Sequence, residues 1–420
     1  MRAKIVFLAL VCLPFVLPAQ QAELGGYVKF FAHPNLNSPY PFDRLGSRIQ
    51  LRLNGTLGEQ AAFYSALDFN YDESQSSPAF NAPRTQGLSI YPVETYVDLY
   101  FSRLDVRLGQ QFIFWGKTDW INPTDNINPW DYVNISAEVE DYRLPVTAAK
   151  FNFYLDDVTL QAVLVPRFKG HRLPLFTPDS MGGLPVWQAP TQIPKNEIKN
   201  AEFGLKADFS LWNVDYSLSY YRGYDKNPTV RMAFDPANHR FVQTISYARQ
   251  HVFGAAFVTT FEHWAIKGEG AYFLTKDRDG KDIFLQNPYL KYVLGVDFLP
   301  NNDWSLNFQF IQSILFKWDE NYERSTRQRL GMPLSTLPHR FTQSLSSRIQ
   351  YQMGDFTSLQ LIGVYNLREG DFFLLPILNY ALCDGINVYG GATLFEGPSG
   401  SPFGRSKKYS RAFFEVKYSF

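Results

Sequence analysis

Cysteine is nearly absent from this chain, which has two among 420 residues, Cys12 and Cys383. Cys12 lies in an N-terminal segment that we expect to be removed. The single remaining thiol forms neither an internal disulfide nor a cysteine-rich metal site. An excess of one charge is also missing, because 40 Lys and Arg balance 40 Asp and Glu. The sequence therefore lacks the basic excess that binds nucleic acid, and no nucleic-acid partner is predicted.

Long hydrophobic runs are missing after the N-terminal segment. No stretch of about eighteen apolar residues follows residue 22, which argues against helical membrane spans. Large apolar side chains are nonetheless abundant, with 37 Phe, 25 Tyr and 8 Trp, so a disordered chain is excluded as well.

Residues 1–22 have the features of a Sec signal peptide. Arg2 and Lys4 give a positive start, residues 5–17 form an apolar run, and Ala19 or Ala22 supplies a small residue for cleavage. The run is too short to cross about 30 Å of hydrocarbon as a helix. We therefore predict export of a mature domain that covers 23–420.

Apolar and polar residues alternate with a period of two in many segments. In 411–420, apolar residues occupy every second position from Ala412 to Phe420, and residues 202–211 follow the same pattern. Successive side chains of a β-strand point to opposite faces, so each segment has one apolar and one polar face. A soluble antiparallel β protein also alternates. Segment lengths of about ten residues, charges in mid-strand and aromatic residues near segment ends favour a transmembrane β-barrel.

The alternation predicts eighteen antiparallel strands between residues 24 and 420, or sixteen if one hairpin is miscounted. Short turns alternate with mostly long loops, including 72–92, 115–144, 167–199 and 315–339. Outer-membrane barrels have this arrangement, with short periplasmic turns and long extracellular loops. We expect one all-β barrel domain over 23–420, with the strand pair 214–231 and 241–261 protruding beyond the membrane.

The predicted barrel has a wide bore. Eighteen strands spaced at about 4.8 Å and tilted by about 40° enclose a cylinder roughly 35 Å across. Wall side chains do not fill such a bore, so water or inward-folded loops must occupy it. Pro376 falls inside the predicted strand 371–381, where a residue without an N–H is a local misfit.

Two segments resemble those of a known family. The C-terminal strand ends in Phe420, and residues 107–132 read RLGQQFIFWGKTDWINPTDNINPWDY. The first is similar to the assembly signal of bacterial outer-membrane β-barrels, and the second to the R-x-G-Q and W-G segment of porin-like barrels. The resemblance implies the outer membrane of a Gram-negative-type envelope, the barrel-assembly machinery, and contact with outer-membrane lipid and lipopolysaccharide. Because porins are commonly trimers, it also leaves a homotrimer open.

The resemblance further suggests that 115–144, the third long loop, folds into the bore and narrows it. Acidic side chains of this loop would then face basic side chains of the wall. The predicted constriction comprises Asp119, Asp125, Asp131, Arg48, Arg52, Arg411 and Lys417. Further predicted lumen-lining residues are Lys29, Glu94, Asp98, Arg107 and Arg348. A solvated surface loop is the alternative for these acids.

The predicted inner face carries eleven bases and nine acids. This near balance predicts weak ion selectivity, and many of these side chains are expected to pair across strands. Arg107, beside Glu94 and Asp98, is expected to form a structural salt bridge. The basic start of loop 167–199 closes the mouth, binds anionic groups or is merely exposed; the sequence leaves all three open.

No motif for catalysis or metal binding appears. The six histidines have no metal-binding spacing, and the chain lacks a G-x-S-x-G elbow and a P-loop. We therefore predict no enzyme activity, no metal and no cofactor. The polar inner faces favour a porin-like channel for passive diffusion of small hydrophilic solutes. Two alternatives stay open: a selective transporter of hydrophobic or exported molecules, and a surface adhesin.

Overall fold

The computed structural model describes residues 21–37, 42–73, 87–119, 121–134, 138, 142–173, 180–181, 183–332, 334 and 337–420. Residues 1–20, which hold most of the predicted signal peptide, lie outside the described residues. In the part that is described, no helix has the length and apolar character needed to cross a membrane.

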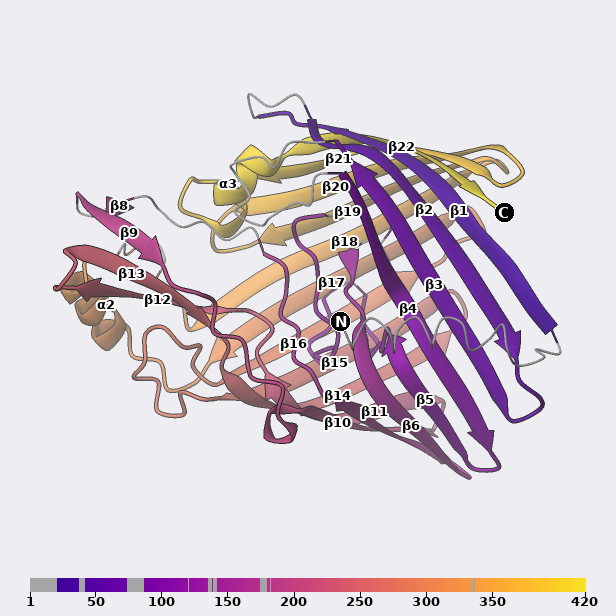
Figure 1. The fold of residues 1–420 in the computed structure, drawn as a ribbon, viewed down its shortest axis with the longest axis horizontal. Helices are drawn as coiled ribbons and strands as arrows, with labels where there is room; N and C mark the ends of the chain where they lie inside the picture. The colour runs from indigo at the N-terminus through magenta and orange to yellow at the C-terminus, as the bar shows by residue number, and fades with distance from the viewer. Residues whose placement is uncertain are drawn as a thin grey trace.

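Eighteen strands form one antiparallel sheet in which neighbours along the chain pair with each other. The first strand pairs with both the second and the last, so the sheet closes into a barrel (Figure 1). The strands are β1 Gln21–Pro34, β2 Phe42–Thr56, β3 Ala61–Asp72, β4 Gly87–Phe101, β5 Leu104–Gln111, β6 Val146–Leu155, β7 Val158–Val165, β10 Glu202–Leu211, β11 Val214–Tyr224, β14 Arg249–Phe261, β15 Trp264–Thr275, β16 Tyr289–Phe298, β17 Trp304–Leu315, β18 Phe341–Met353, β19 Thr357–Asn366, β20 Asp371–Cys383, β21 Ile386–Glu396 and β22 Arg411–Ser419. The predicted eighteen-stranded barrel is confirmed.

Every second connection is a tight turn, and these turns lie at one rim. Between β10 and β11, Trp212 and Asn213 form a two-residue turn with φ of 53° and 59°. Two central residues with positive φ match the right-handed twist of the flanking strands. The intervening loops, at the other rim, are mostly longer, as the sequence predicts.

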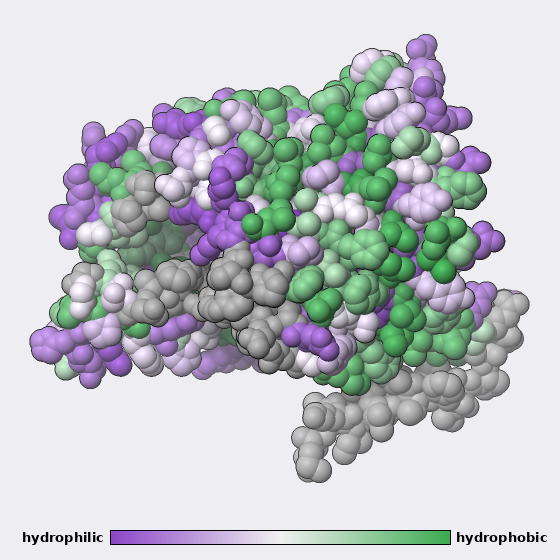
Figure 2. Space-filling model, turned by 90° about the horizontal axis from the view of Figure 1, so that it is seen from above, coloured by the Kyte–Doolittle hydropathy of each residue, from purple (hydrophilic) through white to green (hydrophobic). Residues whose placement is uncertain are grey.

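The wall has an apolar outside and a polar inside. On β22, Phe414 and Tyr418 are each 48% exposed, whereas Arg411 and Glu415 are buried. Exposed large apolar residues recur on the other strands, and Figure 2 shows hydrophobic side chains over the wall with hydrophilic ones toward the ends. This arrangement presents an apolar outer surface and keeps charged groups within the bore.

A smaller sheet lies outside the barrel, at the end that also carries α2 Glu320–Arg329 (Figure 1). Its strands are β8 Ser180–Met181, β9 Leu184–Gln188, β12 Thr229–Asp235 and β13 Arg240–Ser246. The prediction of two continuous strands over 214–231 and 241–261 is therefore wrong in detail. The chain breaks at 225–228, which contains Pro228, and at 247–248, so β11 and β14 stay in the wall while β12 and β13 form the hairpin beyond it.

Three short helices complete the described elements: η2 Ile198–Asn200, α3 Pro402–Ser406 and η4 Lys407–Tyr409.

The pairing of β20 with its two neighbouring strands explains how Pro376 fits within it. Its position pairs with Leu361 of β19, whereas the ladder to β21 is interrupted between Leu374 and Ile377. A residue that lacks an N–H is tolerated where the ladder needs no donor.

Candidate functional site: the interior of the barrel

The long connection between β5 and β6, residues 112–145, packs against the inner wall of the barrel. Its residues Ile113, Trp115 and Ile127 are almost fully buried. They join one apolar cluster with inward-facing wall residues, namely Val146, Ala148, Val163, Val165, Tyr221, Val252, Ala271 and Phe273. A Cβ on Gly204 of β10 would lie only 2.6 Å from the Trp115 ring, so this glycine leaves the space that the indole occupies. The loop therefore covers the inner wall from β6 to β15.

Glu269 on β15 anchors this loop through both carboxylate oxygens. Oε1 accepts hydrogen bonds from the backbone N–H and the hydroxyl of Thr124, each at 2.8 Å. Oε2 accepts from the backbone N–H of Lys117 at 2.8 Å and from the N–H and hydroxyl of Thr118 at 3.1 and 2.9 Å. Gly116 has a φ of 98°, and a Cβ there would lie 2.6 Å from Glu269 Oε2. The W-G pair at 115–116 thus combines a buried indole with a backbone that only glycine readily adopts.

Asp119 carries the loop further across the bore. Its carboxylate lies 2.5 Å from Lys267 Nζ on β15 and accepts a 2.9 Å hydrogen bond from Asn307 on β17. Arg348 on β18 lies 3.9 Å away. These contacts place the predicted constriction residue Asp119 against the wall formed by β15 to β18.

Glu138 connects the same loop to the barrel seam, where the first strand, β1, pairs with the last strand, β22. Its two oxygens each lie 2.6 Å from a lysine Nζ, Lys29 on β1 and Lys417 on β22. Lys29 also lies 3.3 Å from Glu415. The loop acid that meets the predicted basic wall residues Lys29 and Lys417 is Glu138, which is not among the predicted constriction residues.

Asp125 and Asp131 are paired within the loops instead of with the wall. Asp125 is held by Arg143 of its own loop, and burial raises the pKa of Asp125 to about 6. Asp131 lies 2.7 Å from Arg172, which belongs to the loop between β7 and β10. Asp125 and Asp131 therefore have arginine partners in the loops, and the constriction predicted from the loop acids and the basic wall residues stays a prediction.

The loop that follows β7 packs onto the inward loop at several points. His171 Nδ1 accepts a 2.8 Å hydrogen bond from the backbone N–H of Trp130, and burial lowers the pKa of His171 to about 3. The N–H of Tyr132 donates to the carbonyl of Arg172 at 2.9 Å. Residues 171–172 therefore pack against the inward loop, a contact that the sequence does not predict, and the three roles left open for the start of 167–199 stay predictions.

The remaining predicted bases are held on the inner wall by neighbouring acids or amides. Arg48 lies 2.5 Å from Asp68, and Arg411 binds Asp43. Arg52 Nε donates to Gln50 Oε1 at 2.6 Å.

Arg107 forms the structural salt bridge that its position suggested. It donates from two nitrogens to the two oxygens of Asp98 at 2.7 and 2.8 Å. Glu94 instead accepts the N–H of Phe112, the first residue of the inward loop, at 2.9 Å.

Two cavities run along the wall that the loop does not cover. The first, of about 450 Å³, is lined by residues such as Arg44, Asp131, Arg143 and Lys169. The second, of about 740 Å³, is lined from β1 to β7 and by the loop. Arg48 and Val93 line both cavities, so the two adjoin.

Both adjoining cavities have more basic than acidic side chains. The first is lined by six basic and three acidic residues, and the second by five basic and two acidic residues. The near balance that alternation predicts for the whole wall therefore does not describe the open part of the interior.

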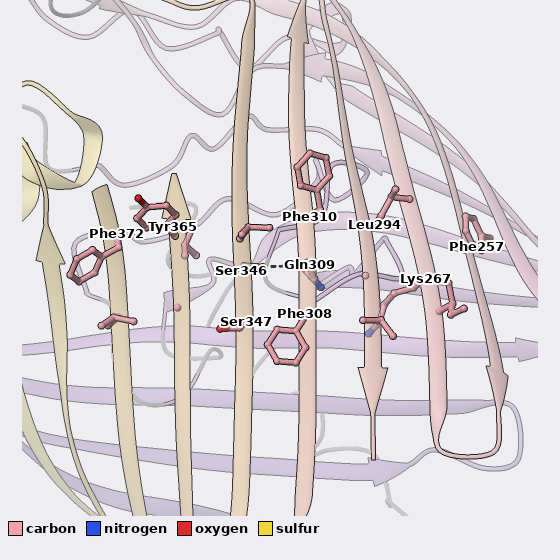
Figure 3. Close-up of a pocket in the computed structure, with 17 residues that line it drawn as sticks. Phe257, Lys267, Leu294, Phe308, Gln309, Phe310, Ser346, Ser347, Tyr365 and Phe372 are labelled. Atoms are coloured by element: carbon pink, nitrogen blue, oxygen red, sulfur yellow. Dashed lines mark hydrogen bonds between the residues drawn. The ribbon is translucent and has the colours of Figure 1, made fainter. Parts of the chain in front are cut away.

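A third cavity, of about 850 Å³, lies on a different face of the wall. Most of its large side chains are apolar and point outward, including the exposed Leu294, Phe308 and Tyr365 (Figure 3). In the same view Gln309 of β17 accepts a 3.3 Å hydrogen bond from Ser346 of β18. This groove belongs to the apolar outer surface and is separate from the two interior cavities.

The attachment of the loop to the wall is not evident from the sequence. Alternation places Glu269 and Lys267 on the inner face, but no local pattern shows that they hold residues 117–124. The hydroxyl-bearing residues Thr118 and Thr124, on either side of Pro123, are the one signal in the sequence, since threonine supplies a second donor beside its backbone N–H.

Comparisons with known proteins agree with the barrel fold. Residues 59–282, more than half of the chain, match the family model described as "Protein of unknown function (DUF1302)". No curated protein matches the chain in sequence. The solved structure of Pseudomonas aeruginosa OccK1 (OpdK) has a TM-score of 0.57 and 10% identity, over 96% of this chain and 99% of that one. This likeness shows a shared fold.

Two further solved structures score lower and add nothing to this conclusion. A loop-deletion mutant of OmpT, an outer membrane protein of Vibrio cholerae, has a TM-score of 0.45 and 10% identity, covering 95% of this chain and 99% of that one. A triple mutant of the Rhodopseudomonas blastica porin has a TM-score of 0.42 and 12% identity, covering 95% of this chain and 100% of that one.

Proposed function

This chain belongs to the DUF1302 family of proteins of unknown function, and we propose that it is an outer-membrane channel through which small hydrophilic solutes diffuse passively. One observation carries the proposal. Two adjoining polar cavities lie along the inner wall of a closed barrel whose outer face is apolar. A barrel of this kind is stable in a bilayer, because closure satisfies every backbone group of the wall.

The inward loop is the element that sets the width of the path. Its apolar cluster with the wall occupies the β6 to β15 side, and its ion pairs reach β15 through Asp119 and the β1–β22 seam through Glu138. Solutes therefore pass on the β1 to β6 side, where the two cavities meet at Arg48. The proposal includes no catalytic step, and export by residues 1–22, the barrel-assembly machinery and a homotrimer stay part of it as predictions.

Planar-bilayer recording of the purified, folded protein tests the channel. We expect stepwise openings in KCl for the wild type. Trp115→Ala removes the largest side chain that fixes the inward loop, so it raises the open conductance by roughly twofold, since the bore itself is wide. Migration before and after heating, which separates folded from unfolded barrels on a gel, checks that each variant is folded.

Trp212→Ala is the matched control, because Trp212 lies in the tight turn and is 85% exposed. This control leaves the conductance unchanged. A folded wild-type protein that inserts into the bilayer without any conductance step contradicts the proposed function. If Trp115→Ala does not fold, Asp119→Asn tests the same loop at its contact with Lys267.

A further inference from the structure

We infer that the larger interior cavity contains a binding site for small organic anions, centred on Arg52 of β2 and Lys150 of β6. This inference rests on the proposed channel and names the class of solute that the channel favours. It replaces the weak ion selectivity expected from the whole wall with a preference for carboxylates.

Arg52 and Lys150 differ from the other basic residues around this cavity, which form salt bridges with acidic side chains. Around this cavity, Arg48 is held by Asp68, Arg107 by Asp98 and Lys417 by Glu138. Arg52 and Lys150 form no salt bridge at bonding distance among the residues that the structure describes, and Glu94 attracts both of them only at longer range. Arg52 uses its Nε on Gln50, which leaves the terminal nitrogens of its guanidinium for a ligand.

The cavity lowers the cost of holding an anion against these groups. Its acidic lining residues are Glu94 and Glu138, and Glu138 is already bound by Lys29 and Lys417. Cationic groups in a partly desolvated cleft attract an anion more strongly than exposed ones. The guanidinium of Arg52 can bind a carboxylate through two hydrogen bonds, whereas Lys150 acts as a point charge.

Aromatic side chains define the rest of the ligand. Tyr64 and Tyr96 are stacked with ring centroids 5.3 Å apart, and both line the cavity, as do Phe112 and Phe114. Arg107 covers the Tyr96 ring at 3.8 Å. A volume of about 740 Å³ with this lining suits an anion that carries a small organic body.

Basic residues also lead from the adjoining cavity toward this site. Arg44, Arg48 and Arg52 lie four residues apart on β2, so their side chains share the inner face. Lys169 lines the first cavity and donates to the carbonyl of Pro145 at 3.2 Å. An anion that enters the first cavity therefore meets positive charge before it reaches Arg52.

Single-channel chloride currents with succinate added test the site, and succinamide serves as the uncharged probe. We expect succinate, and not succinamide, to reduce the wild-type current. Arg52→Gln and Lys150→Gln each raise the succinate concentration needed for half-reduction by about tenfold, because each removes a charged ligand group. Arg52→Lys keeps the charge but loses the planar guanidinium that donates two hydrogen bonds. We expect its succinate concentration for half-reduction to lie between those of the wild type and Arg52→Gln.

Lys407→Gln is the matched control, since Lys407 is also a paired lysine, lies 2.7 Å from Glu396 and lines neither cavity. This control leaves the succinate effect unchanged. An open channel in which succinate acts no better than succinamide, or in which the Arg52 and Lys150 variants behave like Lys407→Gln, overturns the site and leaves the channel intact. A channel that never opens contradicts the proposed function instead.

Discussion

The carboxylate of Glu269 accepts both the backbone N–H and the hydroxyl of Thr124 at 2.8 Å, and so joins the centre of the inward loop to the far wall. Two residues distant in sequence thereby hold the loop against the wall of β15. The opposite oxygen takes three further donors from Lys117 and Thr118. Glu269 is the acceptor in all five bonds. A carboxylate is therefore required at this position, because it offers two acceptor oxygens and no donor.

Glu269→Gln tests this anchor. The glutamine amide presents an NH₂ group where a carboxylate oxygen was, so one backbone N–H loses its acceptor if NH₂ replaces Oε1 and two lose theirs if it replaces Oε2. We expect the attachment of the loop to weaken by about 1–3 kcal/mol, which appears as frequent closures and excess noise in single-channel records. Glu320→Gln in the exposed helix α2 removes a surface ion pair with Arg324 and serves as control. Records of Glu269→Gln that match this control refute the anchoring role.

The Asp125–Arg143 pair predicts a change of selectivity in mild acid. Burial raises the pKa of Asp125 from 3.8 to about 6. Because the folded-state pKa lies above that of the unfolded chain, this group stabilises the fold fully below about pH 4 and loses that contribution as the pH rises through about 6. As the pH falls through 6, the loop loses a negative charge beside Arg143, which lines the first cavity.

Reversal potentials in a KCl gradient measure this effect. Anion preference of the wild type increases between pH 7 and pH 5, and Asp125→Asn removes the change because it carries no titrating group. The Asn variant shows at pH 7 the selectivity that the wild type reaches at pH 5. If the reversal potential changes equally between pH 7 and pH 5 in the wild type and in Asp125→Asn, a group other than Asp125 titrates.

Lys169 predicts a second change at alkaline pH. Desolvation of the Lys169 ammonium group in the lining of the first cavity, with Arg172 and Arg167 nearby, lowers the pKa of Lys169 from 10.5 to about 8. The ammonium therefore loses its proton as the pH rises through about 8, and the first cavity loses one of its six basic groups. We expect anion preference to decline between pH 7 and pH 9 in the wild type and to stay level in Lys169→Gln. A decline of the same size in Lys169→Gln excludes this lysine as its source.

The buried Lys226–Glu202 pair predicts a large effect on stability. Lys226 Nζ lies 2.6 Å from Glu202, which is fully buried and also accepts the hydroxyl of Tyr221 at 2.6 Å. Lys226→Met leaves a buried carboxylate without its counter-ion and lowers the free energy of unfolding by about 3–5 kcal/mol. Denaturant unfolding in detergent micelles, followed by tryptophan fluorescence, measures the loss.

Two variants check this interpretation. Lys199→Met removes an exposed pair with Glu197 and leaves the stability nearly unchanged, because solvent screens such a pair. The double variant Lys226→Met with Glu202→Gln regains part of the stability, since no buried charge is left. A Lys226→Met protein as stable as Lys199→Met contradicts the assignment.

Much of the barrel follows from local pattern. The alternation in 202–211 and 411–420 places the apolar residues outside and the charged ones inside, as β10 and β22 show. The strand count follows because each strand must span the bilayer and each short turn must reverse the chain. The pattern fails over 214–231, because alternation continues through the external hairpin while Pro228 and the surrounding loop end the wall strand.

The interior is decided by tertiary structure. The sequence by itself determined a closed barrel with an apolar exterior, because side-chain alternation along a strand is a local property. It identified Asp119, Asp125 and Asp131 as acidic loop residues but not that they bind Lys267, Arg143 and Arg172. Those partners depend on how the sheet closes and where the loop packs, and only the folded chain brings residues so far apart in sequence within hydrogen-bonding distance.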